Sequence, residues 1–541
     1  MFKKKQIPLI AGILICFTSL QLSAQSDYSN YSKLSQRLKN LQNSNSAICK
    51  LGALTKTVGG HTIWSLTLSK GDAKNKPAIA IVSGVDGKHI LGPEMAVSIA
   101  ENIVKNHAAI LETTTFYIFP NMSPNATENY FSSLKHYKNG NARDTDDDRD
   151  GTINEDPFED LNNDGLITLI RIEDPTGNYI KLKEDERIVV PASKNKGQLG
   201  AYKVMSEGID NDKDGAFNED GKGGVQFNKN FSFKYPYFKP GAGEHAVSEK
   251  ENRALLDFLY QQWNIFAIIT FGPENNLSKP LKFNPSGARK RVVTSILKGD
   301  ASLNKFLSGK YNKITKTKGA PVNTGKGGSF FEWSYFHFGK LGLSTPGWWA
   351  PKFKGDSITK AAKNKYANFL QWADKEGINN AFVPWTAINH PDFPNQKVEV
   401  GGISPYIMYN PPYRMVEGIS KKHTDFIVAL SKMQPNIVIE NVKTESVDNG
   451  ITRITVDIHN NGLLPTHTDM GKRSRWLRKI KVAINLNKNQ ELISGKKITL
   501  VNSIDGDSSV QFSWLIKGKG SVSLEAGTSH TGIDTTTIQL K

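Results

Sequence analysis

Two kinds of hydrophobic pattern divide this chain of 541 residues. Before about residue 435, continuous apolar runs alternate with segments whose apolar residues recur at helical spacing. The apolar runs predict buried strands at residues 76–84, 113–120 and 264–272. Helices are predicted at residues 92–106 and 248–263, the second opening with a capping box of Ser248 and Glu251. This alternation predicts an α/β fold, a mixed sheet with helices on both faces.

After residue 435 the pattern changes to period two. Residues 450–462 (GITRITVDIHNNG) and 479–486 (KIKVAINL) alternate apolar and polar side chains, and no helical stretch follows. We therefore expect a first domain at residues 25–435, followed by an all-β sandwich domain at residues 436–541.

The first 24 residues have the pattern of a signal peptide. Three lysines at positions 3–5 precede an apolar run from Ile7 to Leu20, and small residues lead to a cleavage site after Ala24. We expect an exported protein, periplasmic or extracellular. No later apolar run approaches the roughly 18 residues of a membrane span, so no transmembrane anchor is expected in the mature protein. Cleavage leaves Cys49 as the single cysteine, which excludes an intrachain disulfide framework.

Composition adds a hint about partners. The formal net charge is +17, but the lysines and arginines are scattered along the chain. An exported protein seldom meets nucleic acid, so the sequence favours anionic cell-envelope polymers as partners over nucleic acid.

An acidic island, at about residues 140–225, carries the most specific local signal. Residues 146–156 and 210–220 share the template D-x-D-x-D-G-x-x-N-E-D, and residues 160–167 are a looser copy. Oxygen ligands at positions 1, 3 and 5 and glycine at position 6 suit Ca²⁺. The predicted calcium ligands are Asp146, Asp148, Asp150, Asp160, Asn162, Asp164, Asp210, Asp212 and Asp214.

The glutamate expected at position 12 is missing, because Pro157, Arg171 and Gly221 stand there. Carboxylates at positions 10 and 11 (Glu155 with Asp156, Glu219 with Asp220) offer another way to close the two better loops. Calcium would be structural, holding an insertion with little core of its own. The alternative is a solvated acidic loop.

The stretch GVDGKHILGPE (84–94) places Asp86 and His89 between a predicted strand and a predicted helix. By residue type this is first a turn, in which Asp86 accepts backbone N–H bonds. A metal site is the other reading.

From residue 76 to about 433 the chain resembles the zinc carboxypeptidase family. Five segments occur in the family's order: GVDGKH, FYIFPNMSPNA, GGVQFNKNF, GAGEHAVSEKENRALLDFL and GGSFFEWSYFHFG. The resemblance implies a zinc peptidase fold with three zinc ligands and a catalytic glutamate. Asp86 and His89 take the first two ligand positions.

The remaining positions depart from the family pattern. Phe271 or Gly272 stands where the third ligand, a histidine, is expected, and Glu274 follows nearby, expected to face elsewhere. Pro346 or Gly347 stands at the position of the catalytic base. Asn228 and Lys229 match the pair that holds the substrate's terminal carboxylate, with lysine in place of arginine. A further family arginine corresponds to Lys138 or Arg143.

Two functions follow. The favoured one is a protein that keeps the fold without hydrolysis and binds peptide C-termini or envelope polymers. The alternative is an active metallocarboxypeptidase that uses Asp86, His89 and Glu274 as a non-standard metal site.

Two other stretches attract notice. Residues 382–412 predict a long ordered loop with short strands, in which His390 makes a structural hydrogen bond or binds a metal. The basic run at 471–481 predicts a solvated strand and turn or a contact with an acidic polymer.

Overall fold

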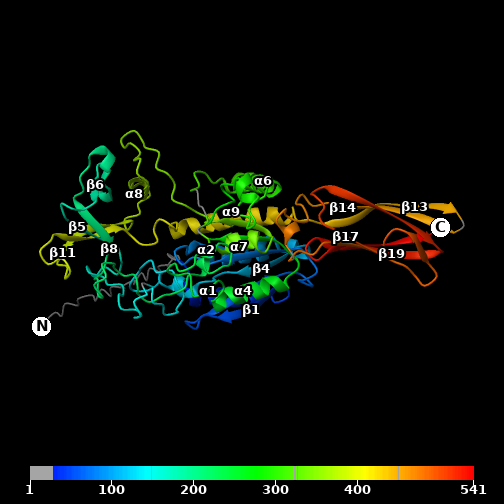
Figure 1. The fold of residues 1–541 in the computed structure, drawn as a ribbon, viewed down its shortest axis with the longest axis horizontal. Coiled ribbons are helices and arrows are strands. Elements are labelled where there is room, and N and C mark those ends of the chain that lie inside the picture. Colours follow the sequence, from blue (N-terminus) through cyan, green and yellow to red (C-terminus); the bar gives the residue numbers. More distant parts are fainter. Residues whose placement is uncertain are drawn as a thin grey trace, which may run out of the picture.

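The fold is described from a computed structural model that covers residues 28–147, 149–321, 325, 327–448, 450–474 and 476–540. The predicted signal peptide and Asp148 lie outside the described residues. The molecule is elongated, with the α/β part in the middle, a β-sandwich at one end and a second, smaller sheet at the other (Figure 1).

The central sheet has six strands in the order β1-β2-β4-β3-β9-β10. They are β1 (Cys49–Lys56), β2 (Thr62–Leu68), β3 (Ala78–Ser83), β4 (Thr115–Phe119), β9 (Ile265–Phe271) and β10 (Leu341–Thr345). β3 is parallel to β4 and β9, and β9 to β10, whereas β1-β2 and β2-β4 are antiparallel. The mixed sheet predicted from the sequence is confirmed.

Helices cover both faces because the buried strands alternate their side chains between two cores. Ile79 and Ile81 face α1 (Tyr31–Ser44), α2 (Leu91–Asn106), α6 (Lys298–Thr315) and α9 (Val416–Ser431). Ala80 and Val82 face α4 (Lys250–Gln261) and α7 (Phe330–Phe336). The described helices include none that is long and apolar enough to span a membrane. Shorter helical segments are α3 (Pro124–Glu128), α5 (Pro285–Ala288), η1 (Ala108–Glu112), η2 (Lys194–Lys196), η3 (Phe227–Lys229), η4 (Tyr413–Met415) and η5 (Gly471–Arg473).

The capping box predicted for α4 is wrong. The N-cap residue is Glu249, and no side chain caps the helix. The Ser248 hydroxyl instead accepts from Asn230 Nδ2 and donates to Glu249. A tertiary contact has replaced the local cap.

A second sheet, which the sequence did not predict, joins the acidic island to the segment before α9. Its order is β11-β12-β5-β8-β6-β7. The strands are β5 (Leu169–Glu173), β6 (Tyr179–Leu182), β7 (Asp185–Pro191), β8 (Tyr202–Ser206), β11 (Phe382–Ile388) and β12 (Val398–Ile403). Ile170, Ile172, Val398 and Val400 form a buried cluster, and α8 (Lys365–Lys375) packs near β7. The insertion buries Ile170 and Ile172 against β12, which lies outside it, so it has little core of its own. The short strands expected within 382–412 are β11 and β12.

The C-terminal part is a sandwich of two four-stranded sheets, β13-β14-β18-β16 and β17-β15-β19-β20. Its strands are β13 (Ile437–Asp448), β14 (Ile451–Asn460), β15 (Ile480–Asn485), β16 (Glu491–Ser494), β17 (Ile498–Val501), β18 (Ser508–Lys517), β19 (Gly520–Thr528) and β20 (Gly532–Leu540). The all-β sandwich predicted from the period-two pattern is confirmed.

The sandwich is attached to the α/β part through buried polar contacts. The Asp300 carboxylate on α6 accepts from Asp469 N at 2.7 Å and from Met470 N at 3.0 Å. Within the basic run 471–481, Trp476 packs on Tyr260, with ring centroids 4.3 Å apart. Part of that run therefore lies in an interdomain contact and is not simply a solvated turn.

Candidate functional site

The residues singled out by the family resemblance meet at the carboxyl edge of the central sheet. From β3 the chain continues to β4 on one side, and from β9 to β10 on the other. The strand order therefore changes direction between β3 and β9, and ligands of open α/β sheets bind at such points. Asp86 follows β3, and Glu274 follows β9.

Asp86 and His89 form a hydrogen-bonded turn. His89 N donates to the Asp86 carbonyl at 3.1 Å, and Lys88 N donates to Asp86 Oδ1 at 2.9 Å. His89 Nδ1 lies 3.4 Å from Asp86 Oδ1, within ion-pair distance when the imidazole is protonated, but this buried nitrogen makes no hydrogen bond. Although burial of Asp86 acts to raise its pKa, the His89 imidazole and the Lys88 amide outweigh it, and the pKa is lowered. The turn expected here is present.

Glu274 is buried beside this turn, 6% exposed. Its Oε1 accepts from Asn228 Nδ2 at 2.8 Å, whereas Oε2 is buried without a partner. Burial, with smaller contributions from the Asp86 and Glu332 carboxylates, raises the pKa of Glu274 to about 7. The expectation that Glu274 faces elsewhere is wrong, because its carboxyl is close enough to feel the charge of Asp86.

These three side chains do not fit a three-ligand zinc site. Zinc needs three protein donors at about 2.0–2.3 Å from one centre. Across the part of the chain that the structure describes, one group of acids and histidines places three donor atoms within 4.8 Å of one another: Asp210, Asp212 and Asp214. Asp86, His89 and Glu274 do not form such a group, and Asp86 Oδ1 already accepts a backbone hydrogen bond. In this arrangement the three side chains do not supply a zinc site.

Gly272, one of the two candidates for the third-ligand position, has no room for a side chain. A Cβ added at Gly272 would lie 2.4 Å from Val85 Cγ2, so no side chain fits there without movement. Glu274 Oε2 lies 3.7 Å from the same point, on the edge of the space that a ligand would take.

Gly347, one of the two candidates for the base position, likewise has no room for a side chain. Gly347 has a φ of +75°, which disfavours other residues, and a Cβ there would lie 2.8 Å from Met95 Sδ of α2. Its backbone N–H donates to Thr345 Oγ1 at 3.1 Å. The sequence from Leu341 to Gly347 contains no carboxylate. The chain end of β10 is thus packed against a helix and offers no proton acceptor of the expected kind.

The predicted carboxylate-binding pair is split between different partners. Asn228 Nδ2 binds Glu274, and its Oδ1 accepts from Phe330 N at 3.0 Å. Lys229 Nζ donates to the Pro240 carbonyl at 3.1 Å, in an exposed position. Asn228 is thus structural, whereas the bond that Lys229 makes to Pro240 lies at the surface.

Both candidates for the family arginine, Lys138 and Arg143, are bound to acidic side chains. Lys138 Nζ bonds Asp147 Oδ2 at 2.7 Å and the Glu219 carbonyl at 2.9 Å. Arg143 Nε donates to Glu249 Oε2 at 3.2 Å. Both cations are part of the packing of the acidic island.

An aromatic segment that the sequence did not assign to the site covers the Asp86 turn. Asn410 Nδ2 donates to the Lys88 carbonyl at 2.8 Å, and Asn410 Oδ1 accepts from Leu91 N at 3.1 Å. The Tyr409 ring meets the His89 ring edge-on at 5.4 Å. Lys88 Nζ lies 4.9 Å from the centre of the Tyr137 ring. The density of proline and aromatic residues at 382–412 is the signal that could have indicated this cover.

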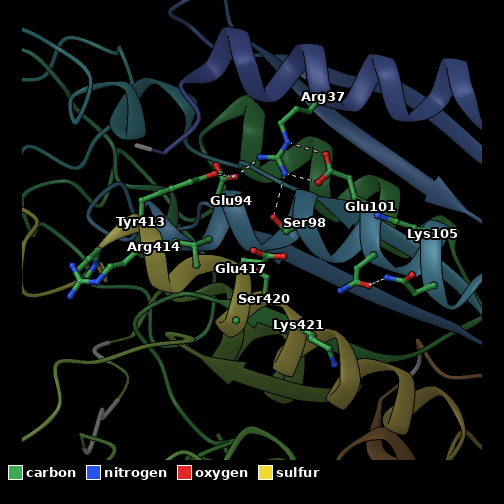
Figure 2. A pocket seen from close by; sticks show the side chains of 15 residues that line it. Arg37, Glu94, Ser98, Glu101, Lys105, Tyr413, Arg414, Glu417, Ser420 and Lys421 are labelled. Atoms are coloured by element: carbon green, nitrogen blue, oxygen red, sulfur yellow. Dashed lines mark hydrogen bonds and ion pairs between the residues drawn. The ribbon is translucent and has the colours of Figure 1, made fainter. Parts of the chain in front are cut away.

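A large surface groove of about 1220 Å³ lies elsewhere, lined by residues of α2 and of the start of α9 (Figure 2). Its central cation, Arg37, is held by Glu101 at 2.7 and 3.0 Å and pairs with Glu94. Ser98 accepts a further bond from Arg37 at 3.3 Å. The buried charged groups of the groove pair with one another, so we interpret them as a structural network.

Comparison with known proteins supports the family resemblance. The zinc carboxypeptidase family model matches residues 34–162, so this part of the chain is related to that family. The match includes Asp86 and His89 and ends before Glu274. A domain of unknown function, DUF8731, matches residues 436–539.

Two solved structures illustrate the structural comparison. Thrombin activatable fibrinolysis inhibitor is 11% identical, with 75% of this chain and 74% of that chain covered and a TM-score of 0.39. Carboxypeptidase A from Helicoverpa armigera is 12% identical, with 65% and 71% covered and a TM-score of 0.37. The comparison with curated proteins found no match.

Proposed function

We propose that this protein is an exported relative of the zinc carboxypeptidases that binds peptide C-termini or anionic envelope polymers without hydrolysing them. One observation carries the proposal: neighbouring side chains leave no room for a side chain at Gly272 or Gly347, each of which is one of the two candidates for a missing catalytic position. A lost general base alone typically lowers a rate about 10²–10⁴-fold. Here the third metal ligand is missing too.

Binding of an anionic group is supported by the net charge of +17. Lys229 stands at the position of the family's carboxylate-binding arginine, and its Nζ donates to the Pro240 carbonyl at 3.1 Å in an exposed position. As a point charge it lacks the bidentate geometry of arginine, so weak and orientation-tolerant recognition is expected.

Titration of peptides with free and amidated C-termini tests this role. Lys229→Met should weaken binding of the free acid and leave binding of the amide unchanged. Lys222→Met, at an exposed lysine nearby, is the matched control and should change neither. Equal affinity of wild type for acid and amide would rule out carboxylate recognition.

A second candidate, an active metallocarboxypeptidase, is favoured by one specific observation. His89 Nδ1 and Glu274 Oε2 are both buried and without hydrogen-bond partners, and both are atoms that bind zinc. A rearrangement would have to bring them together with Asp86. Stoichiometric zinc in the purified protein, with peptide cleavage lost in Asp86→Ala, would establish this function in place of the first.

The proposal includes export and a structural ion. Mature protein recovered from the periplasm or medium should begin at Gln25, which N-terminal sequencing checks. Calcium is proposed as the structural ion of the acidic island at residues 140–225.

A further inference from the structure

The three acidic loops share one backbone geometry. The glycine at position 6 has positive φ in each copy: Gly151 at 102°, Gly165 at 78° and Gly215 at 94°. The residue at position 4 is also left-handed in each copy (Arg149, Asn163 and Lys213 at 74°, 59° and 70°). A turn repeated at this level of detail reflects a common local structure, beyond a shared acidic composition.

The two better loops hold each other through their position-11 aspartates. Asp220 accepts from Asp147 N at 2.8 Å and from Asn154 N at 2.9 Å, positions 2 and 9 of the first loop. Asp156 accepts from the same positions of the second loop, Asn211 N at 2.9 Å and Asn218 N. Both aspartates are almost completely buried. Position 11 therefore serves the neighbouring loop.

Glu207 repeats this contact in the third copy. Its carboxylate accepts from Leu161 N at 2.9 Å and Thr168 N at 2.8 Å, again positions 2 and 9. The third copy has no glutamate at position 10, and Asn162 Nδ2 bonds Asp164 Oδ2 across the loop at 3.0 Å. The third loop is therefore held together by hydrogen bonds within the loop.

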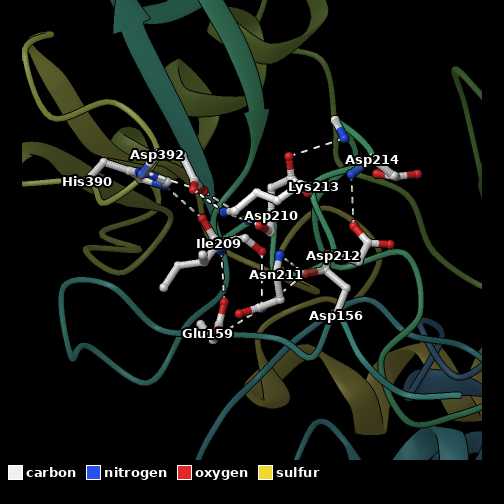
Figure 3. A network of polar contacts seen from close by, with 12 residues as sticks. Asp156, Glu159, Ile209, Asp210, Asn211, Asp212, Lys213, Asp214, His390 and Asp392 are labelled. Carbon is white, nitrogen blue, oxygen red and sulfur yellow. Dashed lines mark hydrogen bonds and ion pairs between the residues drawn. The ribbon is translucent and has the colours of Figure 1, made fainter. Parts of the chain in front are cut away.

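In the second loop, three carboxylates converge. Asp210, Asp212 and Asp214 each place one oxygen within 4.8 Å of the others. Asp210 Oδ1 is buried and has no hydrogen-bond partner. The nearby cation, Lys213, points away, to Asp392 and to the Asp210 carbonyl (Figure 3).

Glu219, at position 10, supplies the independent observation. Both of its carboxylate oxygens are shut off from solvent, and neither accepts a hydrogen bond. Glu155 repeats the arrangement in the first loop, with both oxygens buried and unpartnered. A buried carboxylate with no hydrogen-bond donor is costly unless a cation binds it.

His390 supports the back of the second loop and does not compete as a ligand. Asp392 N donates to His390 Nδ1 at 3.2 Å, so the Nε2–H donates to the Gly208 carbonyl at 2.8 Å. Asp392 in turn accepts from Asp210 N at 3.1 Å. Both ring nitrogens are used, which leaves the carboxylates to face the ion.

We propose that Asp210, Asp212, Asp214 and Glu219 bind one Ca²⁺ ion, and that Glu219 provides from position 10 the glutamate ligand usually found at position 12. An all-oxygen set with several carboxylates suits Ca²⁺, which takes six to eight oxygen ligands in flexible geometry. Mg²⁺ requires near-ideal octahedral geometry, and zinc prefers nitrogen and sulfur donors. The proposal deepens the calcium part of the proposed function and is independent of peptide binding.

Calcium counting by equilibrium dialysis of the intact protein tests the ligand set. Glu219→Gln should bind one Ca²⁺ fewer per chain than wild type. Glu186→Gln, the same change at an exposed glutamate of β7, should bind as many as wild type. If Glu219→Gln binds the same number as wild type, this ligand set is wrong even though the island binds calcium. If wild type binds none, the calcium proposal also fails.

Thermal melting separates binding from a folding defect. In EDTA, Glu219→Gln should melt at or above the wild-type temperature, because the change removes a buried charge. Added Ca²⁺ should raise the melting temperature of wild type, since a ligand stabilises the state that binds it. The rise should be smaller in Glu219→Gln, and an equal amount of Mg²⁺ should raise wild type less than Ca²⁺ does. Equal shifts in both proteins would overturn the inference.

Discussion

Glu274→Gln should stabilise the protein increasingly as the pH rises. The substitution keeps the oxygen that accepts from Asn228 and replaces the ionisable oxygen with a neutral amide, in a buried site that offers Oε2 no partner. Burial raises the pKa of Glu274 from 4.5 to about 7. Glu274 therefore stays protonated to a higher pH in the folded state than in the unfolded state. The free energy of unfolding falls as the pH rises from about 4.5 to about 7 and above.

The size of the effect follows from those two pKa values. The cost of ionising Glu274 is below about 1 kcal/mol at pH 5 and about 3 kcal/mol at pH 8. Chemical denaturation of wild type and variant at these pH values, in EDTA, measures the difference. Glu440→Gln, at an exposed position of β13, is the control and should show no pH-dependent gain.

The opposite sign would refute the reasoning. If Glu274 binds a metal in the folded protein, Glu274→Gln should lower stability in the presence of zinc, because a ligand is lost. A variant that is no more stable than wild type at pH 8 in EDTA would show that the carboxyl is not held in an unfavourable environment.

Three further predictions concern packing and buried charge. Gly272→Ala should destabilise the protein by about 1–3 kcal/mol, because the added methyl group overpacks against Val85. Gly309→Ala, in α6 with open space around it, is the control and should stabilise the protein by up to about 1 kcal/mol. Denaturant unfolding measures both changes. Burial lowers the pKa of Lys340 to about 7. Lys340→Met should therefore raise the free energy of unfolding by about 3 kcal/mol at pH 7, once the lost hydrogen bond to the Ile265 carbonyl is subtracted, and by almost nothing at pH 10. Unfolding curves at both pH values measure the difference. Val400→Ala in the second sheet should cost about 2 kcal/mol and exposed Val442→Ala almost nothing, measured as a shift in melting temperature.

Three strands of the central sheet could be predicted because their signals are local. The runs at 76–84, 113–120 and 264–272 are apolar on both faces, as buried strands of an α/β sheet must be. The second sheet could not be predicted in this way. β5 pairs with β12, more than two hundred residues later in the chain, and no local pattern records such a pairing.

The site was predictable in its position and less so in its contacts. Asp86 and His89 form the expected turn, yet Glu274 turns toward them, because its neighbour Asn228 comes from a separate segment of the chain. In the acidic island, the template indicated positions 10 and 11 as alternatives to position 12. Only the folded chain shows that position 11 crosses to the neighbouring loop.

Incubation of the purified protein with peptides that have free C-termini, with zinc added and the products read by mass spectrometry, tests the central claim most directly. The closed positions at Gly272 and Gly347 predict no release of C-terminal residues, for wild type and for Asp86→Ala alike. Release by wild type that disappears in Asp86→Ala would contradict the account and identify a working metallocarboxypeptidase.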